Sequence, residues 1–255
     1  MTTTKKAAIS LLVLVVLCGF IACLGSVYLV REINLQESGE IVVSGDDGVY
    51  AIDSQTILQD LSQGNNDVFQ YFPDGGLIVT PEPNLPAVHW TEADYLTIAN
   101  QFNQHISNES LENWEYHSIS YSMDCEYFSF GPQQAIFEIV KYIFPDGKKV
   151  RVERRLLMYP HQNRVEWDET QYYAQHNYES FNLEQVKISM EDSLRIAEGL
   201  GGKDFRSSEN NTCRIVQKII AGNRDSNWQV RYTSNDNQYV VHIDKETGDY
   251  QIVEP

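Results

Sequence analysis

The first thirty residues constrain the fold most strongly, because residues 7–30 form an apolar run of 24 residues without a charge. As a helix, with a rise of about 1.5 Å per residue, this run would be about 36 Å long, which is enough to cross a bilayer. Lys5 and Lys6 precede the run, whereas Arg31 and Glu32 cancel each other after it. This asymmetry favours a cytoplasmic N-terminus. We predict a cytoplasmic tail at residues 1–6, a single transmembrane anchor at residues 7–30 and an extracytoplasmic remainder at the cell membrane.

Two alternatives to an uncleaved anchor stay open. The stretch "FIAC", residues 20–23, loosely resembles the end of a bacterial lipoprotein signal, which would place a lipid on Cys23. Ordinary cleavage of a secretory signal is the second alternative. The apolar run continues through "LGSVYLV" after Cys23, which favours the anchor.

The predicted extracytoplasmic part is strongly acidic. Without Lys5 and Lys6 the chain has 17 basic and 36 acidic residues, a net charge of −19. Such a surface repels nucleic acid and anionic membranes. Nucleic acid is therefore not an expected partner. The expected partners are the membrane, through the anchor at residues 7–30, and a protein or peptide whose identity the sequence does not give.

Four cysteines divide into two pairs. Cys18 and Cys23 lie in the apolar run, whereas Cys125 and Cys213 lie in the predicted extracytoplasmic part, where disulfides persist. We predict a bond between Cys125 and Cys213, although two separate thiols fit the sequence equally well. A bond that closes a loop of this length is worth about 4 to 5 kcal/mol in the chain-entropy model.

The segment after the anchor divides into two parts. Residues 31–79 form a small β-rich segment, in which two β-prone runs flank "GDDG" at residues 45–48 and predict a hairpin. Residues 80–90 contain three prolines and predict an extended linker, at which we place a domain boundary.

A helical pattern then occurs twice. "TEADYLTIANQF" begins at Thr91 and "SMEDSLRIAEGL" begins at Ser189, each with a suitable N-cap residue. At this offset of 98 residues, four pairs are identical: Asp94/Asp192, Leu96/Leu194, Ile98/Ile196 and Ala99/Ala197. Apolar stripes at helical spacing follow each cap: Leu96, Ala99, Phe102 and Ile106 in the first copy, and Leu194, Ala197 and Leu200 in the second. We expect Gly201 and Gly202 to end the second helix.

Strand-like stretches follow both helices. In the first copy they lie at residues 114–122, 135–144 and 149–158, and in the second at residues 213–221, 228–233, 239–244 and 250–253. A helix followed by an antiparallel meander is an α+β unit. We therefore predict a first unit at residues 91–160, an aromatic and polar connector at residues 161–188, and a second unit at residues 189–255.

The second unit resembles a PepSY-type domain. The resemblance is in "SMEDSLRIAEGLGG", "WQVRYT" and "YVVHIDKETGDYQIV", above all in the Asp-x-x-Thr-Gly corner that begins at Asp244. Ser193 departs from the pattern, because that family usually has alanine there, and residues 91–160 resemble it only in the order of elements. The resemblance implies two helix-on-antiparallel-sheet units of the PepSY or cystatin-like kind, and an inhibitory or interaction role. At the corner we expect a tight hairpin with Gly248 at positive φ rather than a cation-binding loop.

Motifs of catalysis are not found. The six histidines have no zinc spacing, and the sequence contains no G-x-S-x-G elbow, phosphate-binding loop or dinucleotide fingerprint. Cys125 with His117 or His161 is conceivable as a nucleophile and base, but a structural cysteine is the preferred interpretation. We predict no catalytic residue, no metal and no cofactor.

One tract stands out for its aromatic residues. Residues 159–181 join the two units and place tyrosine and tryptophan among polar residues. The preferred interpretation is a linker that its aromatic residues hold against the surface. The alternative is a recognition loop, because these side chains give a large contact area at low entropic cost. The residues of this candidate recognition loop are Tyr159, Trp167, Tyr172, Tyr173 and Tyr178.

These features together predict a membrane-anchored extracytoplasmic binding or regulatory module rather than an enzyme. Two alternatives belong to different classes. One is an extracytoplasmic hydrolase whose site is assembled only in three dimensions, and the other is a purely structural envelope protein.

Overall fold

The computed structural model describes residues 41–65, 67–72, 88–174, 178–222, 227–235 and 237–253. The predicted tail, the anchor, Cys23 and most of the proline-rich linker lie outside these residues. No helix within the described ranges is long and apolar enough to cross a membrane.

The described chain forms one open, fully antiparallel sheet of ten strands, in the order β10-β9-β8-β7-β3-β4-β5-β6-β1-β2. The protein is therefore of the α+β class, as predicted. The strands are β1 (Ile41–Ala51), β2 (Gln70–Phe72), β3 (Glu115–Asp124), β4 (Gln134–Ile143), β5 (Val150–Tyr159), β6 (Arg164–Tyr173), β7 (Arg214–Ile220), β8 (Trp228–Thr233), β9 (Gln238–Ile243) and β10 (Tyr250–Val253).

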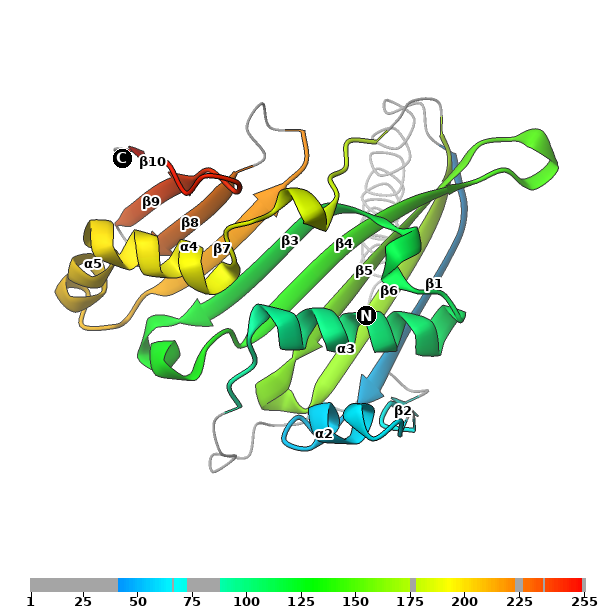
Figure 1. The fold of residues 1–255 in the computed structure, drawn as a ribbon, viewed down its shortest axis with the longest axis horizontal. Helices are drawn as coiled ribbons and strands as arrows, with labels where there is room; N and C mark the ends of the chain where they lie inside the picture. Colours follow the sequence, from blue (N-terminus) through cyan, green and yellow to red (C-terminus); the bar gives the residue numbers. More distant parts are fainter. Residues whose placement is uncertain are drawn as a thin grey trace, which may run out of the picture.

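The longer helices lie on one face of the sheet (Figure 1). Helix α3 (Glu92–Ser107) crosses the half that contains β3 to β6, and α4 (Met190–Ala197) with α5 (Lys203–Ser208) crosses β7 to β9. Helix α2 (Ile57–Ser62) contacts α3. The short turns are η1 (Leu111–Asn113), η2 (Cys125–Phe130), η3 (Pro145–Gly147), η4 (Pro160–Gln162), η5 (Leu183–Gln185) and the wider η6 (Glu198–Gly202).

Both predicted N-caps are present. The Thr91 hydroxyl accepts a hydrogen bond from the Asp94 N–H, and the Asp94 carboxylate accepts one from the Thr91 N–H at 2.8 Å, which completes a capping box. The Ser189 hydroxyl accepts from the Asp192 N–H at 3.1 Å in the same way. The residues that the sequence assigns to the two caps therefore begin α3 and α4.

The predicted end of the second helix is wrong. Gly201, at φ 132°, sits in the wide turn η6, and the chain continues as α5 instead of leaving the helix. A glycine is needed at position 202, because a Cβ atom there would lie 2.4 Å from the Tyr232 hydroxyl oxygen. That hydroxyl donates to the Glu198 carboxylate at 2.8 Å, so the helix bends around a fixed tyrosine.

The core lies between the helices and the sheet. Helix α3 buries Tyr95, Ile98, Ala99 and Phe102 completely, whereas Leu96 and Ile106 of the predicted stripe are only partly buried. In the second half Ala197 is fully buried and Leu194 and Leu200 are partly buried. The buried face of each helix is thus shifted by about one residue from the apolar stripe that the sequence predicts.

The hairpin predicted around residues 45–48 does not form. Residues 41–51 are one strand, β1, which pairs along its length with β6 and has a bulge between Val42 and Ser44. Gly48 is required by packing rather than by a turn, because a Cβ there would lie 2.6 Å from the Trp167 indole nitrogen.

The tract predicted as a connector also differs. Residues 164–173 are strand β6, which lies between β5 and β1 inside the sheet. Only Val165 of this strand is fully buried, so its polar composition concealed the apolar alternation that marks a strand.

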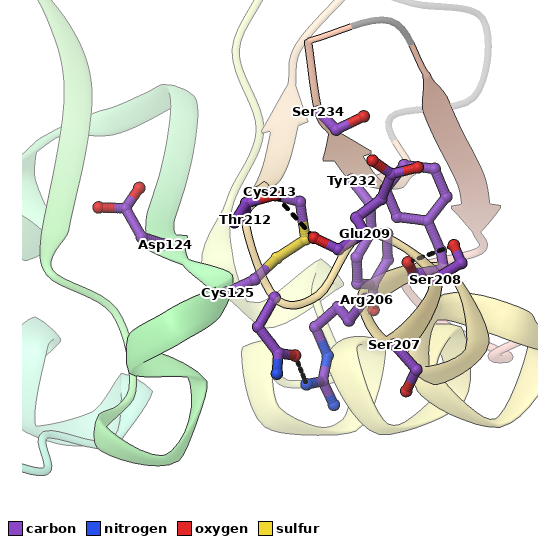
Figure 2. The surroundings of a disulfide bond; sticks show 12 residues. Asp124, Cys125, Arg206, Ser207, Ser208, Glu209, Thr212, Cys213, Tyr232 and Ser234 are labelled. Atoms are coloured by element: carbon purple, nitrogen blue, oxygen red, sulfur yellow. Dashed lines mark hydrogen bonds between the residues drawn. A yellow bond between two sulfur atoms is a disulfide. The ribbon is translucent and has the colours of Figure 1, made fainter.

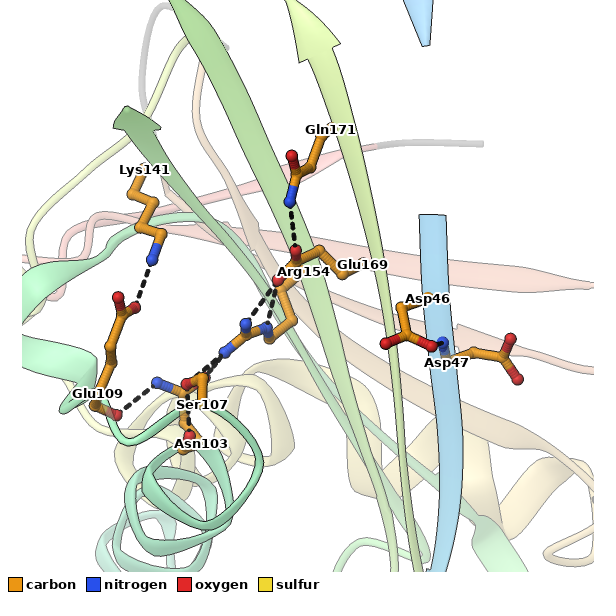
Figure 3. Close-up of polar contacts among 9 residues, drawn as sticks. All are labelled: Asp46, Asp47, Asn103, Ser107, Glu109, Lys141, Arg154, Glu169 and Gln171. Atoms are coloured by element: carbon orange, nitrogen blue, oxygen red, sulfur yellow. Dashed lines mark hydrogen bonds and ion pairs between the residues drawn. The ribbon is translucent and has the colours of Figure 1, made fainter. Parts of the chain in front are cut away.

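A buried arginine joins α3 to β5 and β6 (Figure 3). The Arg154 guanidinium donates to the Glu169 carboxylate through Nε at 3.0 Å and Nη2 at 2.5 Å. Its Nη1 donates to the side chains of Asn103 and Ser107 on the helix. The guanidinium also lies 4.6 Å from the Trp114 ring centre. These bonds compensate for burying a charge under the C-terminal half of α3.

The closing hairpin between β9 and β10 has the predicted form. Gly248 adopts φ 79°, and Asp244 Oδ1 accepts from the N–H groups of Glu246 and Thr247 at 2.9 and 2.8 Å. The Thr247 hydroxyl accepts from the Asp249 N–H at 3.2 Å. The polar side chains of this corner thus serve its own backbone.

Candidate functional site

Side chains alternate between the two faces of the sheet along each strand, and the face opposite the helices carries charged and polar side chains across its centre. One row crosses five strands in direct register: Ser118, Glu138, Arg155, Asp168 and Asp47. The Ser118 hydroxyl donates to Glu138, and Arg155 Nε donates to Asp168 at 2.9 Å. Glu138, Arg155 and Asp168 therefore alternate in charge across the centre of this face, which we call the open face, and the acidic Asp47 ends the row.

A groove of about 1060 Å³ lies at one end of the open face. Its floor is formed by the ends of β3, β7 and β8, and its walls by residues 210–212, residues 234–235 and Glu126. Arg214, Val216, Arg231 and Thr233 alternate along β7 and β8 with residues that are buried under the helices. The groove is therefore a concavity of the open face itself, lined mainly by groups that form hydrogen bonds.

A disulfide between Cys125 and Cys213 lies beside the groove (Figure 2). The two Cα atoms are 5.1 Å apart, and the Cys125 N–H donates to the Cys213 carbonyl at 2.7 Å. Cys125 follows β3 directly and Cys213 precedes β7, so the bond joins the two halves of the sheet where their first strands meet. The floor of the groove is thus cross-linked.

Two arginines supply the positive charge of the groove. Arg214 lies in register between Asp124 and Thr233, and its Nη2 donates to the Ser122 hydroxyl at 3.0 Å. Arg231 is exposed on β8, and its Nη2 donates to the Gln229 side chain at 3.2 Å. Both guanidinium groups retain donors for a carboxylate or a carbonyl oxygen.

The rim of the groove has an unusual backbone. Asn210 and Asn211 both adopt left-handed conformations, with φ of 52° and 60°. Asparagine tolerates this region better than other residues with a Cβ, because its short side chain bonds locally. The two residues turn the chain sharply between α5 and Cys213 and so form one wall.

The structure separates the five residues of the candidate recognition loop. Tyr172 and Tyr178 meet around Arg151 at one end of the open face, with ring centres 5.0 and 4.2 Å from the guanidinium carbon. Tyr159 lies at the other end, where Arg164 stacks on it at 4.5 Å. Trp167 is on the helix side near Arg154, and Tyr173 is exposed at the end of β6.

The Tyr178 cluster is held mainly by its own contacts. The centre of the Tyr178 ring lies 4.2 Å from the centre of the His117 ring. The backbone N–H of Tyr178 donates to the Tyr142 hydroxyl at 2.5 Å. Burial raises the pKa of Tyr178 to about 12, with a further contribution from Glu153, so its hydroxyl stays protonated at neutral pH. The cluster thus fixes the chain after β6 against the sheet.

The conceivable Cys/His pair is not formed. Cys125 forms the disulfide with Cys213 and so has no free thiol. His117 instead forms a hydrogen bond between its Nδ1 and the Glu179 carbonyl oxygen at 2.9 Å. Burial lowers the pKa of His161, which lies at the η4 turn. Within the described ranges, no group of three or more His, Cys, Asp or Glu side chains is arranged to hold a metal ion.

Comparison with protein-family models and with curated proteins found no match to this chain. The resemblance to PepSY-type domains therefore depends on the residues and on the order of the elements alone.

Sequence reasoning missed the groove, although a signal for its arginines was present. In "RIVQKII" and "WQVRYT", Arg214 and Arg231 alternate with apolar residues and so belong to the solvent side of their strands. What the sequence did not show is that these strands lie beside β3, because that pairing joins segments about a hundred residues apart.

Proposed function

We propose that this chain is a membrane-anchored extracytoplasmic binding module, rather than an enzyme, and that it holds a polar polypeptide segment in the groove beside the disulfide. The observation that carries this proposal is the groove itself: an open concavity on a cross-linked sheet, lined by two arginines, two carboxylates and uncharged hydrogen-bonding side chains.

The chemistry of the groove supports a polypeptide ligand. Backbone carbonyls and acidic side chains of a partner would meet Arg214 and Arg231, while basic side chains and N–H groups would meet Asp124 and Glu126. Charges of both signs line the same groove. They would therefore distinguish between partners as well as bind them.

The location is supported by two independent features. The uncharged run at residues 7–30 is long enough to be an anchor, with Lys5 and Lys6 on its cytoplasmic side. The Cys125–Cys213 disulfide is of the kind that persists outside the cytoplasm.

We also propose that the sheet consists of two PepSY-like units. The order helix-strand-strand-strand-strand occurs twice, as α3 with β3 to β6 and as α4 and α5 with β7 to β10. The strand order of each half, counted outward from the β3–β7 pair, is the same. This supports an interaction or inhibitory role by resemblance, because fold alone does not specify function.

A crosslinking experiment in cells tests the groove. A photo-crosslinking residue replaces Thr233, which is exposed in the groove, in the full chain expressed in its native host. The matched control has the same residue at Lys203, which is exposed on α5. We expect a discrete protein adduct from position 233 and none from position 203.

The charge dependence of the adduct completes the test. Arg231→Glu should abolish the adduct at position 233, whereas Arg195→Glu should preserve it, because Arg195 is 73% exposed on α4 and lies outside the groove. Equal adducts at positions 233 and 203, or an adduct that is indifferent to Arg231→Glu, would contradict the proposal.

A further inference from the structure

The hairpin between β4 and β5 projects beyond the neighbouring strands (Figure 1). Its tip is η3, and Phe144, directly before that turn, is 64% exposed. Phe144 is the most exposed of the large apolar side chains in the described part of the chain. An apolar ring at the end of a projecting hairpin costs solvation free energy unless something contacts it.

The hairpin is basic although the chain is acidic. Residues 141–151 contain four basic residues and one acidic residue, whereas the whole chain has a net charge of −17. Lys148 lies over the Tyr173 ring at 5.4 Å, and Lys149 lies over the Tyr142 ring at 4.1 Å. The tip thus combines an exposed phenylalanine with two lysines that extend along aromatic rings.

The same end of the sheet receives the chain from its N-terminal part. Tyr173 is in register with Val150 on one side and with Ile41 on the other, and the Ala174 N–H donates to the Lys149 carbonyl at 3.1 Å. Ile41, the first described residue, is therefore two strands from the base of the hairpin. Ten residues separate Ile41 from the predicted anchor, and they can span at most about 35 Å.

We infer that the tip of this hairpin is a membrane-surface contact, with Phe144 inserted between lipid headgroups and with Lys148 and Lys149 on anionic phosphates. The inference rests on the proposed anchor, which would place this end of the sheet next to the bilayer. An apolar ring flanked by lysines suits an interface, because the ring enters the apolar boundary while the amines remain among the headgroups.

A contact with an anionic membrane is compatible with the acidic net charge of the chain. An acidic surface as a whole repels an anionic membrane, but the repulsion of distant carboxylates is screened within a Debye length of about 8 Å at physiological salt. The charges nearest the bilayer decide the contact, and at this tip two lysines outnumber the single aspartate, Asp146. The open face and its groove would then extend away from the membrane.

Fluorescence quenching in vesicles tests the inference with the full chain. Phe144→Trp is reconstituted into vesicles of phosphatidylglycerol and phosphatidylcholine with brominated acyl chains, and the signal of the unsubstituted chain is subtracted. The control is Tyr127→Trp, because Tyr127 is 43% exposed in η2, at the opposite end of β3. We expect bromolipid to quench the tryptophan at position 144 and acrylamide to reach only the one at position 127.

Neutralising the lysines tests the electrostatic part. With each lysine near an anionic surface worth about 1 kcal/mol, Lys148→Gln with Lys149→Gln should lower the ratio of inserted to free hairpin about 30-fold. Flotation of the vesicles separates the two proposals. A chain that floats while bromolipid leaves position 144 unquenched would overturn the membrane contact alone. A chain that does not float would overturn the anchor and the contact together.

Discussion

Glu92 and Glu191 join the N-termini of the two long helices. The Glu92 N–H donates to the Glu191 carboxylate at 2.7 Å, and the Glu92 carboxylate accepts from the Met190 N–H at 2.9 Å. Each helix therefore receives a carboxylate from the other at its first turn, where the helix dipole favours negative charge. Burial, with smaller contributions from Glu191 and Asp192, nevertheless raises the pKa of Glu92 to about 7.

This pKa predicts that stability falls as the pH rises through neutrality. The native state of Glu92 binds its proton more tightly than the unfolded state does, so its contribution is fully present below about pH 4.5 and is lost as the pH passes 7. We expect wild type to lose up to about 3 kcal/mol of unfolding free energy between pH 5 and pH 8 from this residue. Urea unfolding at both pH values should show a smaller loss for Glu92→Gln.

Asp244→Asn is the control for this titration, because Asp244 is not among the groups that shift the pKa of Glu92. Hydrogen bonds from the Thr247 and Glu246 N–H groups lower the pKa of Asp244, so its contribution is lost only as the pH falls below the ordinary range of a carboxyl group. This variant should keep the wild-type decline between pH 5 and pH 8. If Glu92→Gln kept it equally, the titrating group would lie elsewhere.

The second prediction contrasts two adjacent arginines on opposite faces of β5. Arg154→Ala should cost about 3 to 5 kcal/mol, because it leaves the buried carboxylate of Glu169 without its cation. Arg155→Ala should cost less than about 1 kcal/mol, because the Arg155 side chain is 54% exposed and its pair with Asp168 is solvated. Thermal unfolding monitored by circular dichroism measures both, and similar losses would refute the burial argument.

The third prediction concerns the packing of α3. Phe102→Ala should cost about 3 to 5 kcal/mol, since the ring is fully buried and leaves a cavity. Leu96→Ala should cost less than a full burial implies, because Leu96 keeps part of its surface in water. Chemical unfolding of the two variants should rank them in this order, and the reverse ranking would mean that α3 is rotated on the sheet.

The fourth prediction concerns the disulfide. Replacing Cys125 and Cys213 by serine should lower the unfolding free energy by about 4 kcal/mol, because the bond closes a loop with a sequence separation of 88. Mass spectrometry after alkylation without reductant should find both cysteines unmodified in the unfolded wild type. Alkylated Cys125 and Cys213 would disprove the bond.

The sequence predicted those parts of the fold that local chemistry determines. The caps at Thr91 and Ser189 and the corner at Gly248 each depend on hydrogen bonds within a few residues, and all three have the predicted form. Gly48 and Gly202 misled the interpretation, because each glycine is required by a distant aromatic side chain, Trp167 or Tyr232. Their spacing in the sequence suggests a turn and a helix end, and the contacts that contradict this are tertiary.

The candidate site was hidden for a related reason. Arg214 and Arg231 are separated by 17 positions in the sequence and become diagonal neighbours only when β7 and β8 pair. The aromatic residues of β6 were conspicuous in composition, but alternation sends Trp167 and Tyr172 to opposite faces of the sheet. Composition identifies the side chains that are available, whereas register decides which of them meet.

The central position of β3 has a consequence for biogenesis. One neighbour, β4, follows it within ten residues, but the other, β7, begins at Arg214. At the proposed extracytoplasmic location, a translocon would deliver the residues after the anchor in sequence order. The outer edge of β3, with the thiol of Cys125 at its end, would then stay unpaired until β7 follows, and it would be open to incorrect strand pairing during that interval. Oxidation of Cys125 with Cys213 would consequently be a late event that reports completion of the sheet.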